Sequence, residues 1–218
     1  MTIHDDVDTL MANEQHRLNA LLRRFKRALL TSEVSALPDL CASIDGECIW
    51  PEAFERVVTI KHLSDDVKEF FVRLWFDWGS HLRQEAGDDL LFIPALRKIM
   101  PSYTEGDMIL YRGESAGNRD KCTYGVCWSA QISIARQHAE SGLFHRYSKG
   151  GSRLLRARVP ASNIITHIGA RDGHIEEEYL VDRRGLPEDA VRVLEVFSEL
   201  DPNAAPIGDQ LERPPHGR

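Results

Sequence analysis

The chain has 218 residues, of which 42% are hydrophobic and 28% charged, a composition typical of a globular protein with a substantial apolar core. Its net charge of −7 argues against broad nucleic-acid binding by phosphate neutralisation, which needs a basic face, but leaves a small local anion site open. No run approaches the roughly 18 apolar residues of a membrane span, and the polar, acidic residues 1–6 do not resemble a secretory signal. We therefore expect a cytoplasmic protein with no membrane partner. The sequence leaves delivery into another cell open.

The four cysteines give no metal or disulfide signature. They are Cys41, Cys48, Cys122 and Cys127. No Cys-x-x-Cys pair is present, and the gaps between them fit no common zinc pattern. Free thiols in a reducing compartment are therefore favoured over a metal site or disulfides.

The first hundred residues are predicted to be helical. From Val7 to Leu29, apolar residues recur at spacings of three and four, which indicates a long amphipathic helix. A second strong helix is expected from Ser64, a good N-cap, to Gly87, a plausible stop. Its aromatic stripe is favoured as core packing over a ligand site. Shorter helical pieces are expected over 35–44, 51–59 and 89–100.

The pattern changes near residue 101, after which strands dominate. They are expected over 108–111, 123–128, 154–159, 178–181 and 190–197. One helix is expected to open at Ser129 and close before Gly142. The sequence thus predicts an α+β fold with a helical lobe over 1–101, a strand-rich core over 102–200 and a disordered tail over 201–218.

A candidate anion-binding residue stands at the end of the first expected strand. The stretch 110–114 is Leu-Tyr-Arg-Gly-Glu, so the guanidinium fork of Arg112 lies beside the bare backbone of Gly113. That combination suits a phosphate or a diphosphate. The alternative is a surface arginine paired with Glu114 or another neighbour, and Arg112 taken alone favours this alternative.

The second candidate residue, Ser129, follows Trp128 where a strand meets a helix. Its hydroxyl can cap the helix, and capping alone explains its presence. The same hydroxyl could instead orient a catalytic carboxylate or contact a ligand at the helix N-terminus, where backbone N–H groups favour anions.

The third candidate is the acidic run 176–178. In a strand, Glu176 and Glu178 share one face and Glu177 takes the other. Two like charges on one face suit acid–base chemistry, because each carboxylate perturbs the pKa of the other. The alternative is a solvated acidic edge that prevents aggregation. The polar loop 169–175, just upstream, is expected to contact a partner.

In this order, the three stretches resemble the ADP-ribosyltransferases of the arginine-serine-glutamate group. The resemblance covers roughly residues 108–197 and implies a core of two packed, mainly antiparallel sheets. Helical lobes precede this core in many members. The family's usual Ser-Thr-Ser is replaced here by Ser129-Ala130-Gln131. A tryptophan before the hydroxyl residue and an alanine-rich helix after it are similar to small bacterial and phage members.

The resemblance implies NAD as co-substrate, with no metal. Arg112 would hold the phosphates, and the backbone of Gly113 would meet the nicotinamide amide. Trp128 and Ser129 would line and support the pocket. Glu178 would bind the nicotinamide-ribose hydroxyl and stabilise the cation that forms as nicotinamide leaves.

The resemblance also implies an activity and an acceptor. Glu176 would position and deprotonate the attacking group, and a glutamate here goes with arginine acceptors in the family. We therefore expect a mono-ADP-ribosyltransferase, an effector or toxin that modifies arginine on a target protein. The alternatives are an NAD glycohydrolase and a non-catalytic protein-binding module on the same fold. No nucleic-acid partner is expected.

Overall fold

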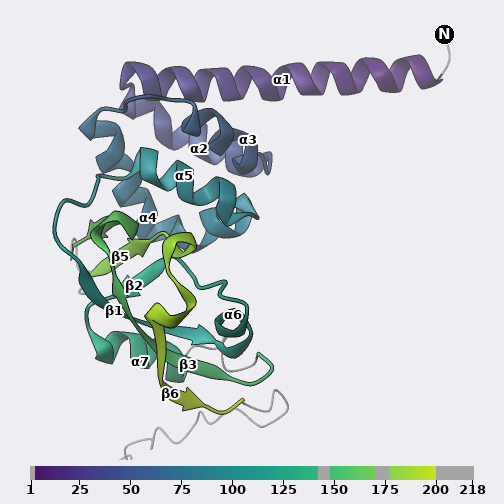
Figure 1. Ribbon diagram of the computed structural model, residues 1–218. Coiled ribbons are helices and arrows are strands. Elements are labelled where there is room, and N and C mark those ends of the chain that lie inside the picture. Colours follow the sequence, from purple (N-terminus) through teal and green to yellow (C-terminus); the bar gives the residue numbers. More distant parts are fainter. Residues whose placement is uncertain (1–2, 142–147, 170–176, 200–218) are drawn as a thin grey trace, which may run out of the picture. The chain divides into compact units, whose positions relative to one another are not determined.

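The computed structural model describes residues 3–141, 148–169 and 177–199. Its contacts divide the chain into two compact units. Unit 1 is formed by Met1–Gly106 with Pro160–Asp182, and unit 2 by Asp107–Val159 with Arg183–Arg218. The positions of the two units relative to one another are not determined (Figure 1), so each is described by itself.

Unit 1 begins with helices, as the sequence predicts. They are α1 (Ile3–Thr31), the short η1 (Val34–Ala36), α2 (Leu37–Gly46), α3 (Trp50–Val58), α4 (Asp65–Ala86) and α5 (Asp89–Ile99). The N-terminal half of α1 extends beyond α2 and α3 (Figure 1). The second half carries the buried side chains of Leu22, Phe25 and Leu29. The predicted amphipathic pattern therefore forms the first layer of the core of unit 1.

Helix α4 has the start and stop that its sequence predicts. The hydroxyl of Ser64 accepts a hydrogen bond from the N–H of Val67 at 3.4 Å, and Gly87 adopts a left-handed conformation with φ of 66°. Phe71 and Trp75 are buried, and the Trp75 ring stacks on Phe92 of α5. The expectation that the aromatic stripe packs in the core is confirmed for these two residues.

The part of unit 1 that the structure describes also includes the strands β4 (Ile164–Ile168) and β5 (Glu178–Val181), preceded by η2 (Ala161–Asn163). They pair antiparallel. Arg97 of α5 donates to the carboxylate of Asp182 at 3.3 Å, and the N–H of Tyr103 donates to the carbonyl of Ile165 at 3.2 Å. These bonds group the two strands with the helices, a division that differs from the predicted boundary near residue 101.

In its described residues, unit 2 contains four strands, β1 (Met108–Ser115), β2 (Cys127–Ser129), β3 (Ser152–Val159) and β6 (Val191–Phe197), in the order β2-β1-β3-β6. Each neighbouring pair is antiparallel. The helices are α6 (Ala116–Asp120) and α7 (Ile132–Ser141), with two short 3₁₀ turns, η3 (Arg183–Gly185) and η4 (Glu188–Ala190). The α+β class is confirmed, whereas two packed sheets remain a prediction.

The α7 helix packs on one face of this ladder at Gly113. A Cβ atom added there would come within 2.8 Å of the carbonyl oxygen of Ala135 and the Cα of Ala139. Leu154, which pairs with Gly113 across β1 and β3, is buried in the same cluster. The bare backbone of Gly113 is therefore needed for close helix–sheet contact.

The expected strand over 123–128 is wrong over residues 123–126, since β2 begins at Cys127. The N–H of Thr123 donates to the carbonyl of Asn118 at 2.9 Å, and the N–H of Gly125 donates to Glu114 Oε2 at 2.8 Å. Because these donors are engaged elsewhere, the segment makes no ladder there. The expected helix from Ser129 begins three residues later, at Ile132.

All four cysteines carry free thiols, as predicted. None of the helices in the described residues is both long and apolar enough to cross a bilayer. The predicted tail 201–218, Glu176 and the part of the partner-reading loop beyond Gly169 lie outside the described residues.

Candidate functional site

Arg112 is held by a carboxylate and a carbonyl. Its Nε donates to Glu114 Oε2 at 2.8 Å, and one terminal nitrogen donates to the carbonyl of Cys127 at 2.5 Å. The Arg112 side chain is 14% exposed, and that of Glu114 is wholly buried. The sequence offered pairing with Glu114 as the alternative to a phosphate-binding role for Arg112. The structure shows that Arg112 and Glu114 are paired.

The carboxylate of Glu114 lies at the centre of a hydrogen-bond network. It accepts from the N–H of Ser115 at 2.9 Å, from Asn118 Nδ2 at 3.0 Å and from the N–H of Gly125 at 2.8 Å. Burial alone raises its pKa, but the charge of Arg112 and the bonds from Gly125, Arg112 and Asn118 outweigh burial and lower the pKa to about 2. Glu114 is therefore a buried, ionised partner that fixes the plane of the Arg112 guanidinium.

The backbone at Gly125 forms one wall of this network. A Cβ atom added at Gly125 would overlap the guanidinium of Arg112. A glycine is therefore required here for the arginine to lie against the chain. The strand expected over 123–128 includes Gly125, and the contact with Arg112 is the physical reason for a glycine at this position.

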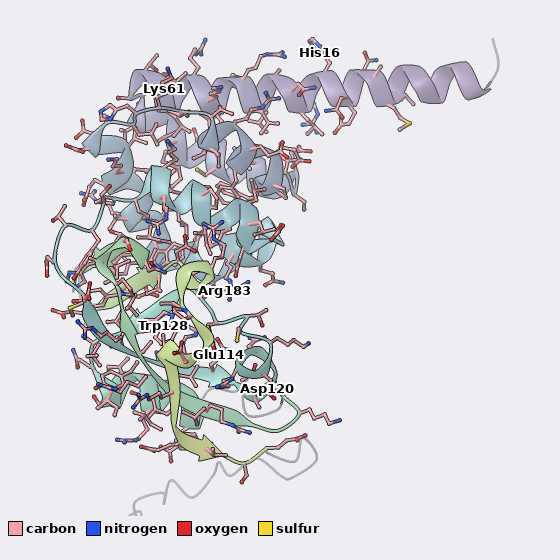
Figure 2. All side chains as sticks on the ribbon, viewed as in Figure 1. His16, Lys61, Glu114, Asp120, Trp128 and Arg183 are labelled. Atoms are coloured by element: carbon pink, nitrogen blue, oxygen red, sulfur yellow. The ribbon has the colours of Figure 1, made fainter. Side chains whose placement is uncertain are left out.

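Trp128 is a core residue in this structure. It is 2% exposed, its Nε1 donates to the carbonyl of Gly125 at 3.1 Å, and its ring meets Tyr124 edge to face at 6.1 Å. Figure 2 labels Trp128 and Glu114, both of which belong to unit 2. The indole therefore supports the segment that carries Gly125 and Cys127.

Ser129 is buried and its hydroxyl organises a turn. Its Oγ accepts from the N–H of Gln131 at 3.0 Å, which stabilises the chain just before α7. Ser129 pairs with Tyr111 of β1. Since adjacent side chains of a strand take opposite faces, Ser129 and Arg112 lie on neighbouring strands but on opposite faces of the ladder.

Glu178 opens β5 opposite Ile168 of β4. Its Oε2 accepts a hydrogen bond from the indole Nε1 of Trp75 at 2.9 Å. Within the described part of the chain, this is the one hydrogen bond of the Glu178 side chain. A half-buried carboxylate is thus oriented through one oxygen by a donor on α4.

The neighbouring Glu177 has a different environment. Its Oε2 lies 4.0 Å from Nε2 of His167, and the His167 ring stacks on Tyr179 with centroids 4.4 Å apart. Glu177 and Glu178 therefore meet different groups, as expected for adjacent residues entering a strand.

The two units divide the predicted site residues. Unit 2 holds Arg112, Gly113, Trp128 and Ser129, and β1 and β2 bring these four onto neighbouring strands. Unit 1 holds Glu178. Because the units are not placed relative to one another, the distances between Glu178 and the other four residues are not determined.

The sequence did not predict the roles of two residues of the site, Glu114 and Trp75. Glu114 follows Arg112 by two positions and therefore shares its face, a signal that points to a pair but not to a buried network. Trp75 carried no signal beyond its helical spacing, because its bond to Glu178 joins residues 103 positions apart.

Among residues 3–141, 148–169 and 177–199, no group of three or more His, Cys, Asp or Glu side chains is arranged to hold a metal ion. No family model, no curated protein and no solved structure matches the chain.

Proposed function

We propose that the chain is a mono-ADP-ribosyltransferase that cleaves NAD and transfers ADP-ribose to a protein acceptor, arginine being favoured. The observation that carries the proposal is the Glu178 carboxylate, which opens β5 and is oriented by Trp75. A half-buried carboxylate costs desolvation free energy, and one oriented bond is the arrangement expected of a group that acts on developing charge. The two packed sheets of the family core are part of this proposal.

In the proposed reaction, Glu178 binds the nicotinamide ribose and stabilises the oxocarbenium-like cation. The glycosidic C–N bond breaks, and nicotinamide leaves with the bonding electron pair. A guanidinium nitrogen of the acceptor then bonds to the ribose carbon and loses a proton to Glu176. This base is needed because a protonated guanidinium is a poor nucleophile.

In this proposal, Arg112 holds the phosphates of NAD. Glu114 and the carbonyl of Cys127 each take one of its nitrogens, so the guanidinium plane is fixed before a ligand arrives. A fixed plane reduces the entropy lost on binding. Trp128 and Ser129 contribute indirectly in this proposal, because they hold the β2 segment and the turn before α7.

The test is incubation of the purified full chain with NAD labelled in the ADP-ribose part, with and without a cell lysate. Label on lysate proteins together with nicotinamide release supports the transferase. Nicotinamide release without labelling would instead identify an NAD glycohydrolase. Absence of both, from folded protein, would favour a non-catalytic binding module.

The key variant is Glu178→Gln, which removes the charge but keeps an oxygen for the Trp75 bond. The matched control is Glu177→Gln, which changes the residue just before β5. Loss of activity in the first and not in the second supports the assignment. For the acceptor, Glu176→Gln is expected to lose protein modification more than nicotinamide release, and equal loss of both would contradict its role as acceptor base.

A further inference from the structure

Two arginines face each other directly across the β3 and β6 strands of unit 2. The register pairs Arg156 with Arg192. Like charges at directly opposed positions of an antiparallel pair repel and destabilise the ladder. The arrangement is unusual in a chain with a net charge of −7, where carboxylates outnumber basic groups.

Neither arginine is neutralised within the described part of the chain. Arg156 and Arg192 make no hydrogen bond or ion pair with any described residue. The nearest carboxylate along β6 is Glu195, and it is taken by Arg136 of α7, whose Nε lies 3.1 Å from each of its two oxygens. Among the described residues, no carboxylate therefore forms an ion pair with either arginine.

The pair lies on the face of the ladder that α7 covers only in part. Side chains of a strand alternate, so Arg156 shares a face with Leu154, which packs under α7. Arg192 is exposed and Arg156 half-buried. Arg158 follows on the same face and reaches Asp107 at 3.4 Å, with both side chains well exposed. Such an exposed ion pair contributes little to stability, and Asp107 forms it with Arg158 rather than with Arg156 or Arg192.

We propose that Arg156 and Arg192 form a binding site for a phosphate-bearing small molecule. Directly opposed residues of an antiparallel pair have Cβ atoms about 5 Å apart. The two guanidinium groups together present more hydrogen-bond donors than one carboxylate can accept. A phosphate carries up to two negative charges and three or four acceptor oxygens, so it can satisfy both forks. The site is separate from the proposed NAD reaction and does not depend on it.

The test is calorimetric titration of the full chain with inorganic phosphate and with pyrophosphate at low ionic strength. Arg156→Gln and Arg192→Gln are each expected to weaken binding by on the order of tenfold or more, because each removes charge-assisted hydrogen bonds. Without ligand, both variants are expected to unfold at the same temperature as the wild type or higher, since the repulsion is relieved. This second readout separates loss of a site from loss of the fold.

A control locates the binding. Arg153→Gln changes an arginine of β3 on the opposite face, whose guanidinium donates to the carbonyls of Gly150 and Ser152. This variant is expected to leave phosphate affinity unchanged. Unchanged affinity in the Arg156 and Arg192 variants would overturn the proposal, as would binding of polyglutamate but not of phosphate.

Discussion

The indole N–H of Trp75 donates to Glu178 Oε2 across 2.9 Å, so a residue of helix α4 sets the orientation of the carboxylate that opens β5. Trp75 is itself buried and stacked on Phe92. A rigid donor of this kind fixes a carboxylate more firmly than a flexible side chain, because little rotamer entropy is lost on forming the bond. The aromatic core of unit 1 thereby supports the candidate catalytic group.

If Glu178 stabilises the departing nicotinamide ribose, then Glu178→Gln should lower the rate of nicotinamide release by about a hundredfold or more. Trp75→Phe keeps the carboxylate and removes its donor. It should lower the rate by about tenfold, the equivalent of one hydrogen bond to a charged group. Rates are compared per folded molecule. A larger effect from Trp75→Phe than from Glu178→Gln would contradict the assigned roles.

The pKa of Glu114 predicts how stability depends on pH. Because its folded-state pKa is about 2 and its ordinary value is 4.5, the folded chain binds fewer protons than the unfolded chain between those limits. The stability that the ionised Glu114 carboxylate contributes is fully present above about pH 4.5 and is lost as the pH falls toward 2. Urea unfolding across this window should show the loss, on the order of 3 kcal/mol.

The control for that measurement is Glu114→Gln. This variant should be less stable than the wild type at neutral pH, because the charge of Arg112 would remain buried without its partner. Its stability should also change less between about pH 4.5 and 2. An identical pH slope in the variant and the wild type would mean that other carboxylates cause the acid sensitivity.

Gly113→Ala should destabilise unit 2 by about 1–3 kcal/mol, since the new methyl group has no space beneath α7. The matched control is Gly117→Ala in α6, where an added Cβ atom meets nothing within 4 Å. The control should be neutral or slightly stabilising. Denaturant midpoints measure both. Equal midpoints for the two variants would show that α7 does not pack as closely on β1 as described.

Ser129→Ala should cost about 1 kcal/mol, because the N–H of Gln131 loses its acceptor. Ser129→Thr keeps the hydroxyl and should recover most of that loss. The readouts are the denaturant midpoint and the rate of nicotinamide release. A large fall in rate without a change in stability would show that the hydroxyl contacts the substrate rather than the turn.

Local patterns in the sequence were sufficient for most of the elements. The apolar spacing from Val7 to Leu29, and the Ser64 cap with the Gly87 stop, predicted α1 and α4. These features act within one or two turns of helix, so the residues that determine them are adjacent in the chain. The same holds for β1, β3, β5 and β6, because the apolar residues that predicted these strands are also adjacent in the chain.

Contacts between distant residues could not be predicted in this way. The strand expected over 123–128 is absent over 123–126. There the N–H of Gly125 donates to Glu114, and the guanidinium of Arg112 lies against the Cα of Gly125. The role of Trp75 could not be predicted, because its indole N–H donates to Glu178, which lies 103 positions away in the sequence. Likewise, the direct opposition of Arg156 and Arg192 depends on the register of β3 and β6.

By itself, the sequence determined the helices, most strands, the α+β class and the positions of the charged candidate residues. The tertiary structure alone decided which of those charges are paired, as Arg112 is with Glu114. The physical reason is range. Helix and strand preferences arise from neighbours along the chain, whereas pairing and burial arise from groups that meet only after the backbone has folded.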